Sequence, residues 1–305
     1  MTRLGVVVNP TAGKGRGTAA GWRTHELLRG RGYEVQDLSA TSLALATDRA
    51  RAAVLDGLDA LVVVGGDGMV HLGVNVVAGS HLPLGIVAAG TGNDIARTLG
   101  LPKPGDVDAS VAAIEHGLRE GPRHVDAVRV GPPGTAAHEW YLGVLSCGFD
   151  AAINARANEM TWPKGSGRYV RALVAELPSF APYGYRVTMD DHVWESTGSL
   201  VAVANAQWFG GGLHIAPDAV VDDGLLDVIV AGPFSKTGVV KIFPGIYRGK
   251  HLAHPSVDVF RSRSVLIEPM SDLGRPPPAA FADGERVGPI PLRVTVEAGA
   301  LSVLR

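Results

Sequence analysis

Cysteine is nearly absent from this chain. Cys147 is the single cysteine among 305 residues. One cysteine cannot form an internal disulfide, which fits a reducing compartment such as the cytoplasm, and the cysteine pairs of a zinc site are missing. The run Val144-Leu145-Ser146-Cys147-Gly148 is typical of a buried strand, so we expect a small core thiol rather than a nucleophile.

Aromatic residues, basic excess and long apolar runs are also scarce. The aromatic content is 6%, and the net charge is −2 with Lys and Arg scattered along the chain, which argues against nucleic acid as a partner. No apolar run approaches the ~20 residues of a membrane-spanning helix. Arg3 leads directly into an apolar run at residues 4–8, so we expect no signal peptide. With 46% hydrophobic residues, the sequence predicts a soluble cytoplasmic protein with a sizeable core.

Glycine, in contrast, is abundant, and one glycine cluster organises the first third of the chain. Leu61-Val62-Val63-Val64 is typical of a buried strand, and Gly65-Gly66-Asp67-Gly68 follows before a helical pattern at residues 69–78. A strand, glycine turn and helix in this order direct backbone N–H groups toward one point, which suits a phosphate. Asp67 would be repelled there unless a divalent cation intervened, so the pattern suggests a Mg-nucleotide site. An ordinary tight turn is the alternative interpretation.

Two more glycine loops follow predicted strands in this region. Asn9-Pro10-Thr11-Ala12-Gly13 follows the strand at residues 4–8, and Gly90-Thr91-Gly92-Asn93-Asp94 follows the strand at residues 84–87. Neither has the Walker or dinucleotide-binding spacing, and Asn93 or Asp94 could simply cap a helix. The alternation predicts a parallel sheet covered on both faces, with ligands at its carboxyl edge. Its other predicted elements are strands at 33–38 and 61–64 and helices at 18–31, 42–56, 95–99 and 107–118.

The pattern changes near residue 125 to a series of short strands. They are predicted at residues 125–130, 140–147, 185–189, 199–204, 226–230, 257–260, 265–268 and 292–296, with helices at 167–176 and 236–242. Sustained short strands separated by turn signals indicate an antiparallel β-sandwich. We therefore predict an α/β domain at residues 1–125 and a sandwich domain at 126–305, whose last strand is able to return to the first domain.

Two acidic turns in the second domain have alternative interpretations. Asp283-Gly284-Glu285 is favoured as a hairpin turn, although a carboxylate there could accept a proton from a substrate hydroxyl. Asp222-Asp223-Gly224 could hold a hard cation, or could be a solvated hairpin. Among the histidines, we expect His25, His116, His192 and His251 at the surface, and none has a partner at metal-ligand spacing.

Together, these motifs resemble the diacylglycerol kinase catalytic-domain family, in its bacterial lipid kinase branch related to sphingosine and ceramide kinases. The resemblance covers nearly the whole chain, and the motifs that carry it are Asn9-Pro10-Thr11-Ala12-Gly13, Gly65-Gly66-Asp67-Gly68, Gly90-Thr91-Gly92-Asn93-Asp94, Gly148-Phe149-Asp150, Pro217-Asp218-Ala219 with Asp222-Asp223-Gly224, and Asp283-Gly284-Glu285. It implies an α/β nucleotide-binding domain, a C-terminal β-sandwich, and ATP bound in the cleft between them.

The resemblance also implies roles for particular residues. Nucleotide contacts fall on Asn9, Pro10, Thr11, Ala12, Gly13, Thr41, Gly65, Gly66, Asp67, Gly68, Met69, Val70, His71 and Thr91. The base that accepts the proton falls on Asp283 or Glu285. In the expected kinase reaction, Asp67 holds the catalytic magnesium, with Asp94 as a candidate second ligand. A structural magnesium falls on Asp223 with the carbonyls of Val220 and Leu225.

The sequence departs from the family at three places in the second motif, Met69, His71 and Leu72. Where the family usually continues Gly-Asp-Gly-Thr-hydrophobic-Asn-Glu, this chain reads Gly66-Asp67-Gly68-Met69-Val70-His71-Leu72. Met69 removes a hydroxyl near the phosphates, and Leu72 removes a carboxylate. Asp67, the residue assigned to the metal, is intact.

The expected function is that of an ATP- and Mg²⁺-dependent lipid kinase in lipid metabolism and phospholipid biosynthesis. Its γ-phosphoryl acceptor would be the hydroxyl of diacylglycerol or a related lipid, reached by transient contact at the inner membrane face. Candidates for an acyl channel, or for plain core and rim positions, are Trp162, Trp208, Phe209, Leu213 and Ile215. The alternatives are a soluble-substrate kinase of the NAD kinase type and a non-catalytic nucleotide or lipid sensor. A homodimer is one of the oligomeric states that the sequence leaves open.

Overall fold

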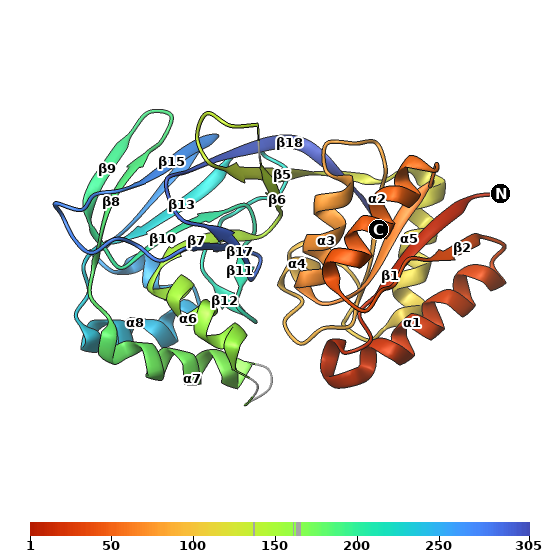
Figure 1. The fold of residues 1–305 in the computed structure, drawn as a ribbon, viewed down its shortest axis with the longest axis horizontal. Helices are drawn as coiled ribbons and strands as arrows, with labels where there is room; N and C mark the ends of the chain where they lie inside the picture. The colour runs from red at the N-terminus through yellow and green to blue at the C-terminus, as the bar shows by residue number, and fades with distance from the viewer. Residues whose placement is uncertain (137, 161, 163–165) are drawn as a thin grey trace. The chain divides into compact units, whose positions relative to one another are not determined.

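The computed structural model describes residues 1–136, 138–160, 162 and 166–305. The chain divides into two compact units (Figure 1): unit 1 comprises Met1–Ala127 with Ala298–Arg305, and unit 2 comprises Val128–Glu297. Two strands, β5 (Arg123–Gly131) and β18 (Leu292–Leu304), contribute residues to both units. The second half of β18 therefore returns the end of the chain to unit 1.

Unit 1 alternates strands and helices along the chain. Its elements are β1 (Arg3–Val8), α1 (Ala12–Gly30), β2 (Glu34–Asp37), α2 (Leu43–Leu55), β3 (Ala60–Gly65), α3 (Asp67–Val77), β4 (Leu84–Ala88), α4 (Asp94–Thr98) and α5 (Val107–Glu120). The strands form a parallel sheet in the order β2-β1-β3-β4, and the end of β18 adds to β4. Every residue of β3 and β4 is buried, as expected for strands covered on both faces.

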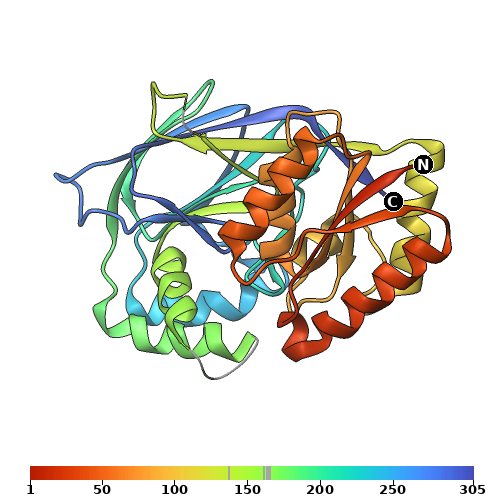
Figure 2. The ribbon, with the colours of Figure 1, turned by 45° about the vertical axis from the view of Figure 1, so that its right-hand side comes forward.

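Helices cover both faces of this sheet, as Figure 2 shows from a second direction. Val62 belongs to a core cluster with residues of α1 and α5, including Leu28 and Ile114. The neighbouring Val63 faces the opposite side, where its side chain lies against Gly73 of α3. Because successive strand residues point to opposite faces, the continuous apolar run of β3 serves both layers.

Unit 2 consists mainly of antiparallel strands, with helices against one of its sheets. Its remaining elements are β6 (Glu139–Tyr141), β7 (Val144–Gly148), α6 (Phe149–Glu159), α7 (Ser166–Glu176), η1 (Leu177–Ser179), β8 (Tyr183–Thr188), β9 (Val193–Gly198), β10 (Leu200–Ala204), β11 (Trp208–Phe209), β12 (Leu213–His214), β13 (Leu226–Ala231), α8 (Lys236–Ile246), η2 (Lys250–Ala253), β14 (Val257–Ser262), β15 (Ser264–Pro269), β16 (Ala280–Ala282) and β17 (Glu285–Gly288). One sheet has the order β14-β13-β10-β7-β16-β17, and the other contains β18-β15-β8-β9 with β5 and β6.

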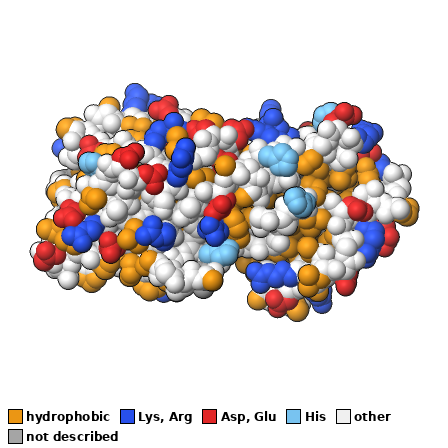
Figure 3. Space-filling view, turned by 90° about the horizontal axis from the view of Figure 1, so that it is seen from above, with side chains coloured by type: hydrophobic (Ala, Val, Ile, Leu, Met, Phe, Trp, Pro, Cys, Tyr) orange, Lys and Arg blue, Asp and Glu red, His pale blue; other side chains and the backbone are white. Residues whose placement is uncertain are grey.

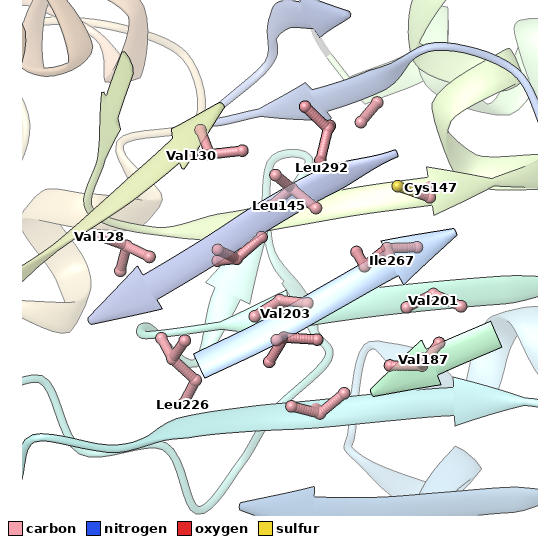
Figure 4. Close-up of a cluster of buried hydrophobic side chains, with 14 of the residues drawn as sticks. Val128, Val130, Leu145, Cys147, Val187, Val201, Val203, Leu226, Ile267 and Leu292 are labelled. Carbon is pink, nitrogen blue, oxygen red and sulfur yellow. The ribbon is translucent and has the colours of Figure 1, made fainter. Parts of the chain in front are cut away.

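The strands β7 and β10 lie between two separate apolar cores. Alternate residues, such as Cys147 and Val203, pack into the core between the two sheets (Figure 4). The residues between them, such as Val144 and Ala202, belong to a second core with side chains of α6, α7 and α8. Cys147 is buried, and burial raises the pKa of its thiol well above its usual range. The predicted core role of this cysteine is confirmed.

The predicted fold class is confirmed: a parallel α/β unit and an antiparallel β-sandwich. Several local predictions were wrong. The strand predicted at residues 140–147 is two strands, β6 and β7, and the helix predicted from residue 18 begins at Ala12. No helix was predicted at α6, since its sequence, FDAAINARANE, mixes polar and small residues without a clear apolar stripe. His251 was expected at the surface but is only 4% exposed.

Basic and acidic side chains are interspersed on the face of the molecule that Figure 3 shows, without a concentrated basic patch. Among the residues that the structure describes, no helix combines the length and the apolar content needed to cross a bilayer.

Candidate active site

Three loops of unit 1 pack against one another at the carboxyl edge of the sheet. Gly13, after β1, lies so near the β4 loop that an added Cβ would be 2.2 Å from the carbonyl oxygen of Ala89. A Cβ on Gly90 would lie 2.4 Å from the Cα of Gly66. The glycines therefore allow backbones to approach where no side chain fits. The structure thus brings together the predicted glycine loops of residues 9–13, 65–68 and 90–94.

The first of these loops has an unusual backbone. Gly13, Lys14 and Gly15 have φ of 56°, 65° and 94°, which interrupts α1 near its start. Asn9 fixes the turn before it, because its side-chain oxygen accepts hydrogen bonds from the backbone N–H and the hydroxyl of Thr11. The predicted glycine loop is therefore present, although α1 begins at Ala12, before the loop has ended.

Asp67 links two of the loops. It opens α3 directly after Gly66, and its Oδ1 accepts a hydrogen bond from the backbone N–H of Ile95 at 3.1 Å. Asp94 is the residue before Ile95, so the Asp67 carboxylate contacts the backbone N–H that directly follows Asp94 in the chain. Arg97 donates a hydrogen bond to Oδ1 of Asp94 at 2.7 Å, and the Asp94 side chain is almost wholly buried.

The two carboxylates suit a nucleotide-bound magnesium ion. Mg²⁺ in nucleotide sites is commonly held by one or two carboxylates, with phosphate oxygens and water completing its shell. Within the described ranges, no three His, Cys, Asp or Glu side chains gather into a cluster that could hold a metal alone. A magnesium ion held by Asp67 and Asp94 would therefore take its other ligands from phosphates and water, and at Asp94 it would compete with the guanidinium of Arg97.

The three departures in the second motif are buried residues. Met69 and Leu72 are both buried, and the Met69 side chain packs where a Cβ on Gly65 would stand. His71 is buried too, with its Nε2 3.2 Å from the side-chain nitrogen of Asn75. Met69 and Leu72 thus contribute apolar packing to α3 in place of the hydroxyl and carboxylate usual in the family.

A pocket of about 510 Å³ lies beside the first loop in unit 1. Pro10 and Thr41, both predicted nucleotide residues, line it together with Trp22, Arg29 and Arg49. An aromatic face and two cations are suitable contacts for a base and for phosphate charge. Sequence reasoning missed Trp22 as a lining residue, because only the fold places α1 beside Thr41.

In unit 2, the predicted base residues form a hairpin turn. Asp283 and Gly284 connect β16 to β17 with φ of 53° and 89°. The hairpin turn that the sequence favoured at this position is therefore present. The two carboxylate oxygens of Asp283 accept hydrogen bonds from the backbone N–H groups of Gly143 at 2.8 Å and Leu142 at 3.0 Å. These bonds hold the turn against the link between β6 and β7.

The predicted structural metal site contains a guanidinium. Arg261 donates a hydrogen bond to Oδ2 of Asp223, while Oδ1 accepts one from the backbone N–H of Leu225 at 3.0 Å. Nε of Arg261 also lies 3.9 Å from Oδ1 of Asp227. A magnesium ion bound to Asp223 with the carbonyls of Val220 and Leu225 would therefore compete with this side chain.

An apolar cavity lies between the helices of unit 2 and the sheet beneath them. Its enclosed volume is about 80 Å³, within about 660 Å³ of empty space that includes its open side, and the inner sides of α6, α7 and α8 line it. Phe209, Leu213 and Ile215 of the predicted acyl channel are among the lining residues, whereas Trp162 and Trp208 are not. Trp162 is instead 69% exposed, and Trp208 stacks on His214 at 4.6 Å between ring centroids.

Two polar residues that sequence reasoning assigned no role also line this cavity. His251 donates from Nε2 to the carbonyl oxygen of Ile215 at 2.9 Å, and burial lowers the pKa of its ring. Asp150 has two buried carboxylate oxygens, neither with a hydrogen-bond partner. Burial raises the pKa of Asp150 to about 6, although the nearby Ser146 hydroxyl favours the ionised form. Only its membership of the Gly148-Phe149-Asp150 motif pointed to Asp150.

Comparison with known proteins agrees with this arrangement. Residues 3–130 match the family model described as the diacylglycerol kinase catalytic domain, and residues 143–305 match the YegS C-terminal NAD kinase beta sandwich-like domain. A diacylglycerol kinase of Mycobacterium tuberculosis is 34% identical over 99% of this chain and 95% of that protein. This chain belongs to the diacylglycerol kinase family.

Other members of the diacylglycerol kinase family extend the comparison. A diacylglycerol kinase of Bacillus subtilis is 24% identical over 83% of this chain and 81% of that protein. The crystal structure of a diacylglycerol kinase from Bacillus anthracis has a TM-score of 0.71 at 21% identity, over 99% of this chain and 96% of that one. The latter likeness supports the fold. The resemblance found from the motifs is confirmed, and the chain is a member of a family of lipid kinases.

Proposed function

We propose that this protein transfers the γ-phosphoryl group of ATP to the hydroxyl of diacylglycerol or a related lipid. The observation that carries the proposal is the packing of three glycine loops, with Asp67 and Asp94, at one edge of the parallel sheet. Their backbone N–H groups suit phosphates, and phosphoryl transfer depends mainly on positioning and charge neutralisation. Bound magnesium would neutralise phosphate charge, with Asp67 and Asp94 as its protein ligands.

The apolar cavity of unit 2 favours a lipid acceptor over a soluble one. The hydrocarbon side chains that line it, such as Leu213 and Phe243, offer little to a nucleotide acceptor of the NAD kinase type. Burying an acyl chain contributes about 0.8 kcal/mol for each CH₂ group. Because the acceptor is a lipid, the enzyme would work in transient contact with a membrane surface.

We propose Glu285 as the base and Asp283 as its positioning residue. Two backbone N–H groups already hold the Asp283 carboxylate, so its role is to fix the turn that presents Glu285. In the transfer, the lipid oxygen forms a bond to the γ-phosphorus as its proton passes to the Glu285 carboxylate. The bond from that phosphorus to the bridging oxygen breaks, and ADP leaves with the electron pair.

A kinase assay with ATP, Mg²⁺ and a panel of acceptors tests the proposal. Mass spectrometry of the products should show a phosphorylated lipid. Asp67→Asn should abolish this product with little loss of stability, because the amide oxygen is still able to accept the hydrogen bond from Ile95 and no core volume is removed. Asp56→Asn, an exposed change in the same unit, is the matched control. Phosphorylation of NAD alone would support the soluble-substrate alternative, and nucleotide binding without transfer would support a sensor.

The base is tested by comparing two substitutions. Glu285→Gln should lower kcat roughly 10²–10⁴-fold, the usual contribution of a general base, and leave the unfolding midpoint unchanged. Asp283→Asn should lower both activity and stability, because the charged carboxylate that accepts hydrogen bonds from two backbone N–H groups is lost. Wild-type kcat in Glu285→Gln would refute the assignment.

A further inference from the structure

The outer faces of α7 and α8 expose apolar side chains over the cavity that their inner faces line. On α7, Tyr169 and Leu173 line the cavity, whereas Val174, one residue further, is 64% exposed. On α8, Val239 lines the cavity and Val240 is 49% exposed. Both helices lie on the same side of unit 2 in Figures 1 and 2.

Contacts join these helices and the segment before them into one surface. The rings of Tyr169 and Phe243 stack at 6.4 Å between centroids, and Lys236 donates a hydrogen bond to the carbonyl oxygen of Pro178 just beyond α7. Arg171 of α7 lies over the exposed Trp162 ring at 5.2 Å and donates to its carbonyl oxygen at 2.7 Å. We call the exposed side chains of residues 162, 167–176 and 236–250 the helical face.

The charge of the helical face is mainly positive. The segment from Lys236 to Lys250 contains four basic residues and no acidic one: Lys236, Lys241, Arg248 and Lys250. On α7, Arg171 adds a further positive charge, while the acidic Glu176 is already paired with Arg156. Tyr247, an amphipathic aromatic residue of the kind enriched at membrane interfaces, is 40% exposed.

We propose that the helical face docks on a lipid surface that carries anionic head groups. Exposed valines and a tryptophan amid lysine and arginine form the pattern of an interfacial amphipathic surface, with apolar groups entering the acyl boundary and cations meeting head groups. A protein partner would not account for the apolar cavity directly beneath the face. The lipid would thus pass from the bilayer between helices whose outer sides face lipid and whose inner sides line the cavity. This inference rests on the proposed lipid kinase function.

Vesicle flotation of the full chain, without ATP, tests the docking. Binding to phosphatidylcholine vesicles containing phosphatidylserine should exceed binding to phosphatidylcholine alone and should weaken with salt. The double substitution Val174→Asp and Val240→Asp should reduce binding at least about tenfold, and Lys241→Ala about fivefold, the worth of one cation at an anionic surface. Leu55→Asp, at an 88% exposed leucine of unit 1, should change nothing.

Activity on a short-chain lipid dispersed as monomers separates docking from catalysis. The double variant should keep wild-type kcat on this acceptor while losing activity on vesicles. Unchanged vesicle binding in the double variant overturns the docking proposal. So does dissociation of a wild-type dimer by the same substitutions in sedimentation, which would assign the face to a second copy of the chain. Vesicle binding without phosphorylation of any lipid would refute the proposed function and leave the docking proposal standing.

Discussion

The substitution Asp150→Asn should remove a pH dependence from the stability of unit 2. The carboxyl of Asp150 is buried beside the apolar cavity, and its pKa rises from 3.8 to about 6. Between these values the folded chain keeps a proton that the unfolded chain releases. Stability must therefore fall as pH rises through this window, in the opposite sense to a carboxylate held by a salt bridge.

The magnitude follows from the same rise in pKa. A tenfold change in proton affinity is worth 1.36 kcal/mol, so the rise from 3.8 to about 6 corresponds to a loss of about 3 kcal/mol. The stabilisation by the bound proton is complete below about pH 4 and lost above about pH 6. Asp150→Asn cannot titrate, so its stability relative to wild type should rise by about 3 kcal/mol across this range. The difference in stability at any one pH also depends on the hydrogen bonds that the new amide forms in the fold.

Urea unfolding monitored by tryptophan fluorescence provides the assay. Trp22 is the one tryptophan of unit 1, so a Trp22→Phe background makes the signal report unit 2. Free energies of unfolding are compared between Asp150→Asn and its parent at several pH values. Asp191→Asn, an exposed change in the same unit, should show no such trend. A difference between Asp150→Asn and parent that stays constant with pH would show that the carboxyl is not held protonated in the fold.

Two further substitutions test the contacts described above. Gly90→Ala should destabilise unit 1 by about 1–3 kcal/mol and raise KM for ATP, because the new methyl group meets Gly66. Gly30→Ala, whose methyl group enters open space, should have neither effect, and equal unfolding midpoints for the two variants would contradict the packing of the loops. Arg261→Gln should lower the free energy of unfolding by at most about 1 kcal/mol, since the ion pair with Asp223 is half-exposed. It should also make the thermal unfolding of unit 2 depend on Mg²⁺, because Asp223 is then open to the ion. An equal dependence on Mg²⁺ in the wild type would show that the ion displaces the guanidinium.

Elements with strong local signals could be predicted from the sequence. The run from Leu61 to Val64 followed by glycines predicted both a buried strand and a turn, because apolar β-branched residues and glycine each have a direct backbone preference. The hairpin at Asp283 was predictable for the same reason, since Asp-Gly accepts positive φ. Local chemistry therefore gave the order of the elements and the loops of the candidate site.

Features that depend on tertiary packing could not be predicted in the same way. The helix α6 follows β7 directly, and its sequence shows no apolar stripe, because contacts with α7 and with the sheet support it. The exposure of Trp162 and the burial of His251 depend on which helix covers which strand. Asp150 shows the limit most clearly, because an unpartnered buried carboxyl differs from a helix-capping aspartate only in its surroundings.

The path of β18 has a consequence for how the protein is made. Residues 303 and 304 pair with Leu84 and Gly85 of β4, and Ala300 accepts a hydrogen bond from the backbone N–H of Gly79. A ribosome synthesises these residues after all of unit 2. The nascent chain therefore leaves one edge of β4 unpaired throughout translation of the sandwich. Unit 1 acquires this last strand only when the second half of β18, which follows the sandwich in the sequence, pairs with that edge.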